Sequence, residues 1–522
     1  MHRPRLIHYS DAHHYHAKRI EPPASLHMLQ WPVDELAGTG ADTLALGLGY
    51  GDVFFHDTKV GRSVGQWKET WESYIDWRIM RMVEEGRRLG TDQVRACIER
   101  GRELGVRVVP SLKMQDSHSP GAQRCGRLKW EKGAEVSIGE EGRHLFGYDF
   151  ALAEVRDYKL ALLRELLEDY GPHGLELDFL FGTQYFKTGE ESAAEIMSGF
   201  IADLRKLMDE TTPDGGERLP LMVRVDLQEE VNRAAGLDVT GWLEAGIVDH
   251  VVGQDGWILT DTEPKPTWLP RAANAAGAAA YYRPPRRVLH EAVPFLHIEM
   301  WRALQQSLAL DGWAGLYHGY MPWPFADEEH AFLREMAYPE TTERRDKRYF
   351  LQPREGPAEG ETTTPHRVLP LPLEAGEVLR VPIHVADDVD AARADGEMRK
   401  PVLTLLFHFY CIEDDVEIRF NGQTLDVADA EITDERALFY PVRLYGTQEL
   451  QAPMAGSYHW FRFRLDVDSV RRGENIVEVD VKSCEPRAAF TRSLSGVELY
   501  MRYRDMERPL GLKQDRIGPK ST

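Results

Sequence analysis

Residues 173–186 read HGLELDFLFGTQYF, and they place two acidic side chains inside an otherwise apolar run. The segment Leu175–Phe179 predicts a buried strand that follows a helical pattern. Side chains on a strand alternate between its two faces, so Glu176 and Asp178 point the same way, with Cα atoms about 6.6 Å apart. Buried carboxylates are costly unless they are paired, hydrogen-bonded or next to water. The stretch therefore predicts either a functional pair facing a cleft or a structural pair that caps the following loop.

Seven more short apolar runs accompany this strand, and amphipathic helical patterns lie between most of them. The predicted strands are Arg5–Tyr9, Thr43–Leu48, Val106–Leu112, Leu175–Phe179, Leu221–Val225, His250–Gly253, Ala278–Tyr282 and Gly315–His318. The predicted helices include Trp71–Arg88, Thr91–Leu104, Ala151–Asp169, Ala193–Glu210 and Glu299–Leu310. This alternation favours an α/β fold of the closed (β/α)₈ TIM-barrel type over an open sheet. No GxGxxG follows a strand and no GxxxxGK[ST] occurs, which argues against the two commonest nucleotide-binding folds.

The composition changes after the barrel region. The stretch LQPREGPAEGETTTP at 351–365 is rich in turn-forming residues and is typical of a linker. Strand-like runs without helices follow, namely Val378–Val385, Val402–Phe409, Val416–Phe420, Tyr458–Val467, Ile476–Val481 and Val497–Tyr503. This spacing favours a jelly-roll-like β-sandwich. The sequence thus predicts a barrel over 1–345, a linker over 346–366, a sandwich over 367–505 and a tail over 506–522.

Composition narrows the class of protein. The 522 residues are too many for one hydrophobic core, and the formal net charge of −22 argues against a nucleic-acid-binding protein. The four cysteines show no zinc-finger spacing, and free thiols are favoured over a bond between Cys411 and Cys484. No signal-peptide core or membrane-spanning stretch occurs, so the chain as written is expected to be cytoplasmic, or secreted or periplasmic if its start is trimmed. The sequence predicts no cofactor and does not indicate the oligomeric state.

Polar side chains follow the ends of most predicted barrel strands, and active sites of TIM barrels lie at the carboxyl ends of the strands. The candidate catalytic residues are Glu176, Asp178, Asp226 and Asp255. The candidate substrate-binding residues are Asp11, His13, Tyr50, Lys113, Asp116, His118, Arg224, Gln254, Trp257, Tyr317, His318 and Trp323. We expect the acids to converge at one mouth of the barrel, where they and the aromatic rings suit a polyhydroxylated ligand.

Some of these residues have alternative roles. Clustered metal-ligand types lie near the N-terminus at Asp11, His13, His14 and His16, but the HxH spacing is common and no HExxH accompanies it, so no metal is predicted. Four side chains are as typical of the core as of a ligand site, namely His118, His318, Trp257 and Trp323. Arg224 is also a candidate partner that keeps Asp178 ionised.

Three motifs resemble one known family. The GLELDF strand is similar to the fourth-strand motif of the glycosyl-hydrolase-like ten group of glycosidases, found in bacteria that degrade complex polysaccharides. The third-strand end KMQDSH and the segment AAGLDVTGWLEAGIVDHVV resemble the same group. The resemblance spans residues 1–340 and implies a TIM-barrel glycosidase. The C-terminal IRFNGQTL and RRGENIVEVDV resemble the galactose-binding-like sandwich appended to many such enzymes.

The expected function is hydrolysis of a poly- or oligosaccharide. That reaction needs one carboxylic acid to protonate the leaving oxygen and one carboxylate to attack the sugar or activate water. Because Glu176 and Asp178 share a strand, one of them can serve to orient the other, with Asp226 or Asp255 as the second catalytic carboxylate. Two alternatives stay open: a non-catalytic carbohydrate-binding barrel, and a polysaccharide lyase or isomerase whose base is His118 or Lys113.

Overall fold

The computed structural model of the chain describes residues 2–66, 68–139, 145–213, 215–254, 259, 261–263, 267–285, 298–319, 325, 327–352, 369–433 and 458–503. Contacts between residues divide the chain into two compact units. The first unit contains Met1–Gln254, Pro266–Arg283 and Gly312–Ala337. The second contains Asp255–Lys265, Pro284–Asp311 and Tyr338–Thr522.

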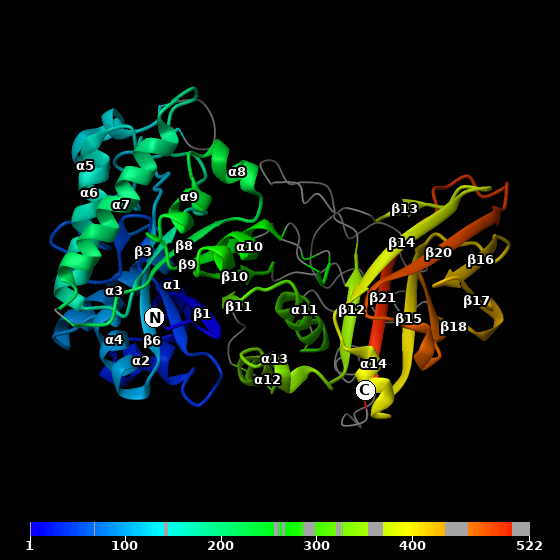
Figure 1. Ribbon diagram of the computed structural model, residues 1–522. Helices are drawn as coiled ribbons and strands as arrows, with labels where there is room; N and C mark the ends of the chain where they lie inside the picture. The colour runs from blue at the N-terminus through cyan, green and yellow to red at the C-terminus, as the bar shows by residue number, and fades with distance from the viewer. Residues whose placement is uncertain are drawn as a thin grey trace. The chain divides into compact units, whose positions relative to one another are not determined.

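The first unit is built on a closed barrel of eight parallel strands (Figure 1). Their order around the barrel is β1, β11, β10, β9, β8, β7, β6 and β2. Their bounds are Leu6–Asp11 (β1), Thr43–Gly47 (β2), Arg107–Lys113 (β6), Leu175–Asp178 (β7), Leu221–Asp226 (β8), His250–Gln254 (β9), Ala279–Arg283 (β10) and Gly315–Gly319 (β11). Every predicted barrel strand is present, and no strand end differs from the prediction by more than two residues. The predicted TIM-barrel fold is confirmed.

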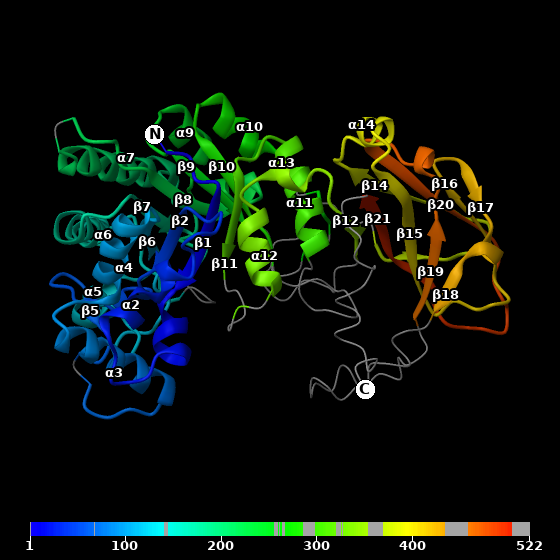
Figure 2. The same cartoon turned by 90° about the horizontal axis from the view of Figure 1, so that it is seen from below.

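Helices follow most of these strands, and Figure 2 shows α6 and α7 outside the barrel beside β7. The α-helices are Ala12–His14 (α1), Leu26–Asp34 (α2), Tyr74–Arg88 (α3), Gln93–Leu104 (α4), Arg127–Lys132 (α5), Ala153–Glu165 (α6), Ala193–Thr211 (α7), Glu229–Ala234 (α8), Val239–Glu244 (α9), Trp268–Ala275 (α10) and Asp327–Glu335 (α12). The π-helical turns Tyr15–Arg19 (η1) and Leu166–Tyr170 (η3) and the 3₁₀ turn Gly133–Val136 (η2) extend α1, α6 and α5. Local chemistry sets helix ends. Asp92 caps α4 by accepting from the Arg95 N–H at 2.9 Å, and Gly105 ends it at φ +72°.

The strand register defines which side chains face the barrel interior. One buried cluster consists of inward-facing side chains from six of the barrel strands, namely Ile7, Tyr9, Ala45, Met222, Val252, Ala279, Tyr281 and Tyr317. Glu176 pairs in register with Met222, and Asp178 pairs with Arg224. Because side chains alternate, Glu176, Asp178 and Arg224 also face inward. Phe179 has the opposite parity, and its ring centroid lies 5.9 Å from that of Trp242 on α9.

A small three-stranded sheet follows β2 and was not predicted from the sequence. Its strands are Gly49–Tyr50 (β3), Val53–Phe54 (β4) and Arg62–Ser63 (β5). Two residues are too few to show an alternating pattern, which explains why the sequence did not reveal them. A separate apolar cluster joins this region to α3 through Tyr50, Val53, Phe55, Val64, Ile79, Met80 and Val83.

The second unit contains two antiparallel sheets that share one apolar core (Figure 1). One sheet has the order β12, β21, β15, β19 and β18, with β13 paired to β21, and the other has the order β14, β20, β16 and β17. The bounds are Lys347–Leu351 (β12), Leu371–Pro372 (β13), Val378–Val385 (β14), Met398–His408 (β15), Asp415–Phe420 (β16), Gln423–Leu425 (β17), Glu431–Thr433 (β18), Tyr458–Arg464 (β19), Gly473–Ser483 (β20) and Ser493–Tyr503 (β21). The helical elements are Ile298–Leu310 (α11), Pro339–Thr342 (α13), Val389–Ala394 (α14), Val427–Asp429 (η4) and Val467–Ser469 (η6).

Two local features of the second unit differ from the sequence prediction. Strand β12 occupies residues 347–351, where the linker was predicted to begin, because its alternating residues pair with β21. Helix α14 lies between two strands in a region predicted to have no helices. It is short and begins at Asp388, whose side chain accepts from the Ala391 N–H at 3.1 Å. The predicted domain boundaries stay predictions, and residues 353–368 and 504–522 lie outside the described residues.

No helix in the described part of the chain is long and apolar enough to cross a membrane.

Candidate active site

Two carboxylates and one guanidinium group occupy the barrel interior on adjacent strands. Arg224 on β8 forms an ion pair with Asp178 on β7 between Nη2 and Oδ2. The Arg224 Nε atom also lies 3.4 Å from Glu176 Oε1. The three residues are 0–3% exposed. A buried carboxylate pair is stable only with such compensation, so Arg224 is the group that permits both acids here.

Glu176 has two unequal oxygen atoms. Its Oε1 accepts from the Ser111 hydroxyl on β6 and the Tyr317 hydroxyl on β11, both at 2.9 Å. Its Oε2 is buried and has no hydrogen-bond partner among the described residues. Burial raises the pKa of Glu176, and the charge of Asp178 adds to the rise while Arg224 opposes it. A carboxyl group with a raised pKa and one unoccupied oxygen is suited to hold and donate a proton.

Asp178 is held through both of its oxygens. Oδ2 is paired with Arg224, and Oδ1 accepts from the Leu180 N–H at 2.9 Å in the loop after β7. The Arg224 guanidinium lies 5.0 Å from the ring centroid of Tyr9 and 5.7 Å from that of Tyr317. Burial alone would lower the pKa of Arg224, but Asp178 and the other surrounding groups raise it well above its ordinary value. The positive charge next to Asp178 is therefore permanent.

The ends of the next strands extend this polar group. Gln254 on β9 accepts hydrogen bonds at its Oε1 from Arg224 at 3.5 Å and from Arg283 on β10. Asp226 is the last residue of β8 and pairs in register with Gln254. It lies two residues after Arg224, so its side chain faces the same side of the sheet. It is half-buried, and its Oδ1 accepts from the Gln228 N–H at 2.8 Å. The interior thus offers donors and acceptors continuous with the Glu176–Asp178 pair.

A second group of predicted residues lies at the ends of β1 and β6 and on β3. Lys113 Nζ lies 3.5 Å from Asp11 Oδ2 and donates to the Gly49 carbonyl at 2.8 Å. Burial alone would raise the pKa of Asp11, but Lys113 and the neighbouring histidines bring it below its ordinary value. The rings of His13 and Tyr50 are 5.6 Å apart, and burial lowers the pKa of His13. The His13 backbone N–H donates to Asp11 Oδ1 at 3.3 Å, which links the two pairs.

Asp116 and His118 form a hydrogen-bonded dyad in the loop after β6. His118 Nδ1 lies 2.7 Å from Asp116 Oδ1, while Asp116 Oδ2 accepts from the Gly126 N–H at 2.9 Å. Lys129 Nζ lies 3.7 Å from the same Oδ2. Burial alone would raise the pKa of Asp116, but the His118 hydrogen bond and Lys129 bring it below its ordinary value. The His118 side chain is 26% exposed, so its outer edge is accessible.

The structure does not bring every predicted residue to this site. His318 has the opposite parity from Tyr317, pairs in register with His8, and lies with its ring 4.3 Å from that of Phe332 on α12. It therefore faces the surrounding helices. Asp255, Trp257 and Trp323 lie outside the described residues.

Three residues near the acids were missed in the sequence, namely Tyr9, Ser111 and Arg283. Tyr9 lies two residues after the inward-facing Ile7, and Ser111 pairs in register with Glu176. Arg283 is the last residue of β10 and pairs in register with Gln254. Alternation along the strands was the signal that could have identified them.

One histidine of the N-terminal cluster, His16, is fully packed in the interior. His16 Nδ1 lies 3.0 Å from the Ala12 carbonyl, and burial lowers the pKa of His16 to about 4. Among the described residues, no group of three or more His, Cys, Asp or Glu side chains is placed to hold a metal ion.

No family model and no curated protein matches the chain. Several solved structures match the chain at low identity and low TM-score. A cycloisomaltooligosaccharide glucanotransferase from Paenibacillus sp. is 9% identical with a TM-score of 0.37, and the match covers 95% of this chain but only 57% of that chain. The maltogenic alpha-amylase AmyB from Thermotoga neapolitana is 12% identical with a TM-score of 0.38, covering 91% and 98% of the two chains.

The glycoside hydrolase domain of PgaB (BpsB) from Bordetella bronchiseptica is 13% identical with a TM-score of 0.41, covering 64% of this chain and 98% of that domain. At these identities and TM-scores the matches assign neither a fold nor an activity to this chain. The barrel fold is shown by the hydrogen-bonded pairing of this chain's own strands.

Proposed function

We propose that this chain is a glycoside hydrolase that cleaves a poly- or oligosaccharide at the interior carboxylates of its barrel. The observation that carries the proposal is the unequal environment of Glu176 and Asp178. Burial raises the pKa of Glu176 and leaves its Oε2 without a partner, whereas Asp178 is paired with Arg224. Two carboxyl groups with different environments are the usual basis for separate acid and base roles.

In this mechanism Glu176 is the general acid. Its Oε1 is held by Ser111 and Tyr317, so the proton resides on Oε2 and is delivered to the glycosidic oxygen as the bond breaks. Asp178 supplies the carboxylate that attacks the sugar carbon or activates water, with its charge balanced by Arg224. If Asp178 serves only to orient Glu176, the half-buried Asp226 is the next carboxylate along the interior.

The assignment to the glycosyl-hydrolase-like ten group is part of this proposal. It is supported by the GLELDF motif, which contains both proposed catalytic acids, and by the KMQDSH strand end. The substrate class is supported by the dense set of hydrogen-bonding groups around the acids, because a sugar ring presents hydroxyl groups on every side.

A screen of the purified chain against a panel of polysaccharides tests the proposal. Released reducing ends and ultraviolet absorbance are recorded together for each polysaccharide. We expect reducing ends without new absorbance, because hydrolysis creates no double bond. A bound polysaccharide that yields neither signal would favour a non-catalytic carbohydrate-binding barrel.

The His118–Asp116 dyad favours one second candidate, a polysaccharide lyase or isomerase. The Nδ1 atom of His118 is bound to Asp116, which leaves the accessible edge of the ring as a base. Lys113 is less suited because it is paired with Asp11. In the same screen a lyase gives an ultraviolet-absorbing product, and His118→Asn should abolish this product. The proposed hydrolase gives no ultraviolet-absorbing product.

A further inference from the structure

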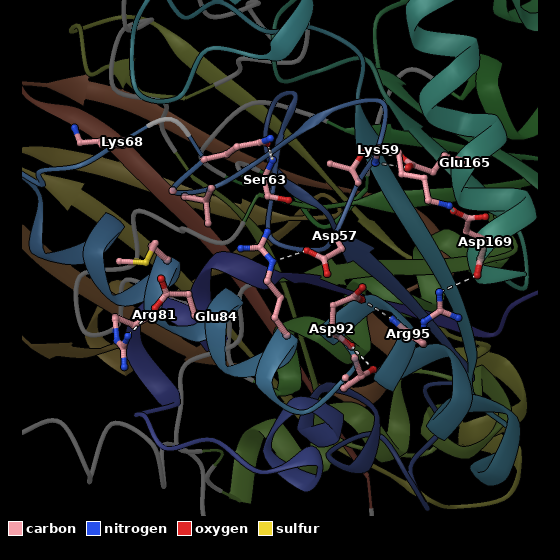
Figure 3. Close-up of a pocket in the computed structure, with 18 of the residues that line it drawn as sticks. Asp57, Lys59, Ser63, Lys68, Arg81, Glu84, Asp92, Arg95, Glu165 and Asp169 are labelled. Atoms are coloured by element: carbon pink, nitrogen blue, oxygen red, sulfur yellow. Dashed lines mark hydrogen bonds and ion pairs between the residues drawn. The ribbon is translucent and has the colours of Figure 1, made fainter.

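The first unit contains a recess that lies away from the barrel strands. It has a volume of about 940 Å³ and is lined by residues of the β4–β5 region, α3, the start of α4 and the end of η3 (Figure 3). None of the lining residues belongs to the eight barrel strands. The recess is therefore separate from the Glu176–Asp178 pair. We refer to it as the outer groove.

We propose that the outer groove is a second carbohydrate-binding site that holds a neutral polysaccharide chain. This inference rests on the proposed function, since it assigns to the groove the same class of ligand as the barrel. It is supported by the paired charges along the walls and by two indole rings, of which Trp77 is exposed and Trp71 is half-buried.

Most cations of the groove walls are paired with a carboxylate. Three ion pairs recur along it, Arg87 Nε–Asp57 Oδ1 at 2.7 Å, Lys59 Nζ–Asp169 Oδ2 at 2.7 Å and Arg81 Nη1–Glu84 Oε2 at 2.6 Å (Figure 3). These three cations are thus already neutralised by a carboxylate, and Lys68 is paired with Glu72 at 2.7 Å. The remaining cation, Arg95, donates to the Asp169 backbone carbonyl at 3.0 Å. A polyanionic ligand would have to compete with those carboxylates, whereas sugar hydroxyl groups can donate to the acids and accept from the bases without disturbing a pair.

Aromatic rings lie on the α3 side of the groove. Trp77 is 43% exposed, and its ring centroid lies 6.3 Å from that of the half-buried Trp71, with an angle of 67° between the two ring planes. Lys68 Nζ lies 5.5 Å from the Trp71 ring centroid. A large indole exposed next to a polar recess offers a flat apolar face with a polar edge. The C–H face of a sugar ring can stack on such a surface while its hydroxyl groups reach the paired charges.

Binding of the full chain to neutral polysaccharides, measured by affinity gel electrophoresis, tests the inference. The parent is Glu176→Gln, which prevents cleavage during the run. Trp77→Ala in this parent is compared with Trp130→Ala, because Trp130 is also exposed, at 39%, but lies on α5 outside the groove. We expect Trp77→Ala to weaken binding by about tenfold or more, or about 1.4 kcal/mol, while Trp130→Ala binds as the parent does.

Two further measurements distinguish the loss of an aromatic contact from a loss of folding. Trp77→Phe retains an aromatic face and should keep most of the binding. Thermal unfolding of each variant verifies that the fold is intact. Equal binding by Trp77→Ala and Trp130→Ala would overturn the inference, as would the failure of the parent to bind any neutral polysaccharide.

Cleavage assays on the wild-type chain test the glycosidase proposal independently of the outer groove. Binding that depends on Trp77 without release of reducing ends would reject the hydrolase and keep the groove. Cleavage together with Trp77-independent binding would reject the groove and keep the hydrolase.

Discussion

Arg224 and Asp178 are direct neighbours on adjacent parallel strands, and their side chains form an ion pair inside the barrel. This contact is possible because both positions share the inward parity of their strands. It places a permanent positive charge where two carboxyl groups would otherwise repel each other. The chemistry of the candidate site depends on this pair, since Arg224 also reaches Glu176.

The first prediction concerns the two acids. We expect Glu176→Gln and Asp178→Asn each to lower kcat/KM on a cleaved polysaccharide by about 10² or more, on the order of 3 kcal/mol, because each removes an acid–base or nucleophilic group. Steady-state kinetics measure the loss, and circular dichroism verifies folding. Asp226→Asn is the matched comparison. Near wild-type rates in the first two variants with a large loss in Asp226→Asn would move the catalytic role to Asp226.

The second prediction concerns the pH dependence of stability. The pKa of Glu176 in the folded chain is raised above its ordinary value of 4.5, so the folded state holds this proton more tightly than the unfolded state. As pH rises from 4.5 through the folded pKa, Glu176 must ionise in the interior and the free energy of unfolding falls. The slope is at most about 1.4 kcal/mol per pH unit.

Urea unfolding between pH 4.5 and 8 measures this effect against Glu176→Gln, which has no proton to lose. The stability of the wild type relative to this variant should decrease across the window. Asp178→Asn should reduce the decrease, because Asp178 contributes to the raised pKa. A constant difference between wild type and Glu176→Gln across the range would contradict the prediction.

Much of the barrel was predictable because each of its strands is a short apolar run between helical patterns. The three strands β3, β4 and β5 were not, because two residues carry no periodic signal. Alternation likewise predicted that Glu176 and Asp178 share one face of their strand, and that Arg224 and Asp226 share one face of theirs. The register of β7 and β8 places Arg224 beside Asp178. The strands and the shared faces depend on local sequence, which is the information that a periodic pattern carries.

The contacts across the barrel depend on its closure, which local sequence does not carry. The Tyr317 hydroxyl donates to Glu176 from a strand on another part of the ring. The sequence prediction also placed both Tyr317 and His318 at the site, although adjacent residues of a strand face opposite sides. Applying alternation strictly would have retained Tyr317 and assigned His318 to the outer layer.

The third prediction tests Arg224 as the counter-charge. Arg224→Met leaves Asp178 and Glu176 buried without it, so the free energy of unfolding should fall by about 3–5 kcal/mol at neutral pH. The double variant Arg224→Met/Asp178→Asn should recover part of the loss, because it removes one of the two uncompensated carboxylates. Urea unfolding measures both. A double variant less stable than Arg224→Met would indicate that Arg224 acts chiefly through packing against Tyr9 and Tyr317.

The fourth prediction concerns a buried ion pair outside the proposed catalytic pair. Asp52, between β3 and β4, accepts from Lys159 on α6 at 2.5 Å, and both side chains are inaccessible. Burial raises the pKa of Asp52 even with Lys159 present. Lys159→Met should therefore destabilise the chain by about 3–5 kcal/mol, since it leaves Asp52 without its cation.

A double-mutant cycle with Asp52→Asn isolates the pair. If the two groups act through each other, Lys159→Met/Asp52→Asn is more stable than Lys159→Met alone, because no buried charge is left unpaired. Lys159 Nζ also lies 3.4 Å from the Lys113 carbonyl at the end of β6. We therefore expect Lys159→Met to weaken substrate binding, seen as a higher KM, with a smaller effect on kcat. Additive single and double effects on stability would show that Asp52 and Lys159 contribute independently.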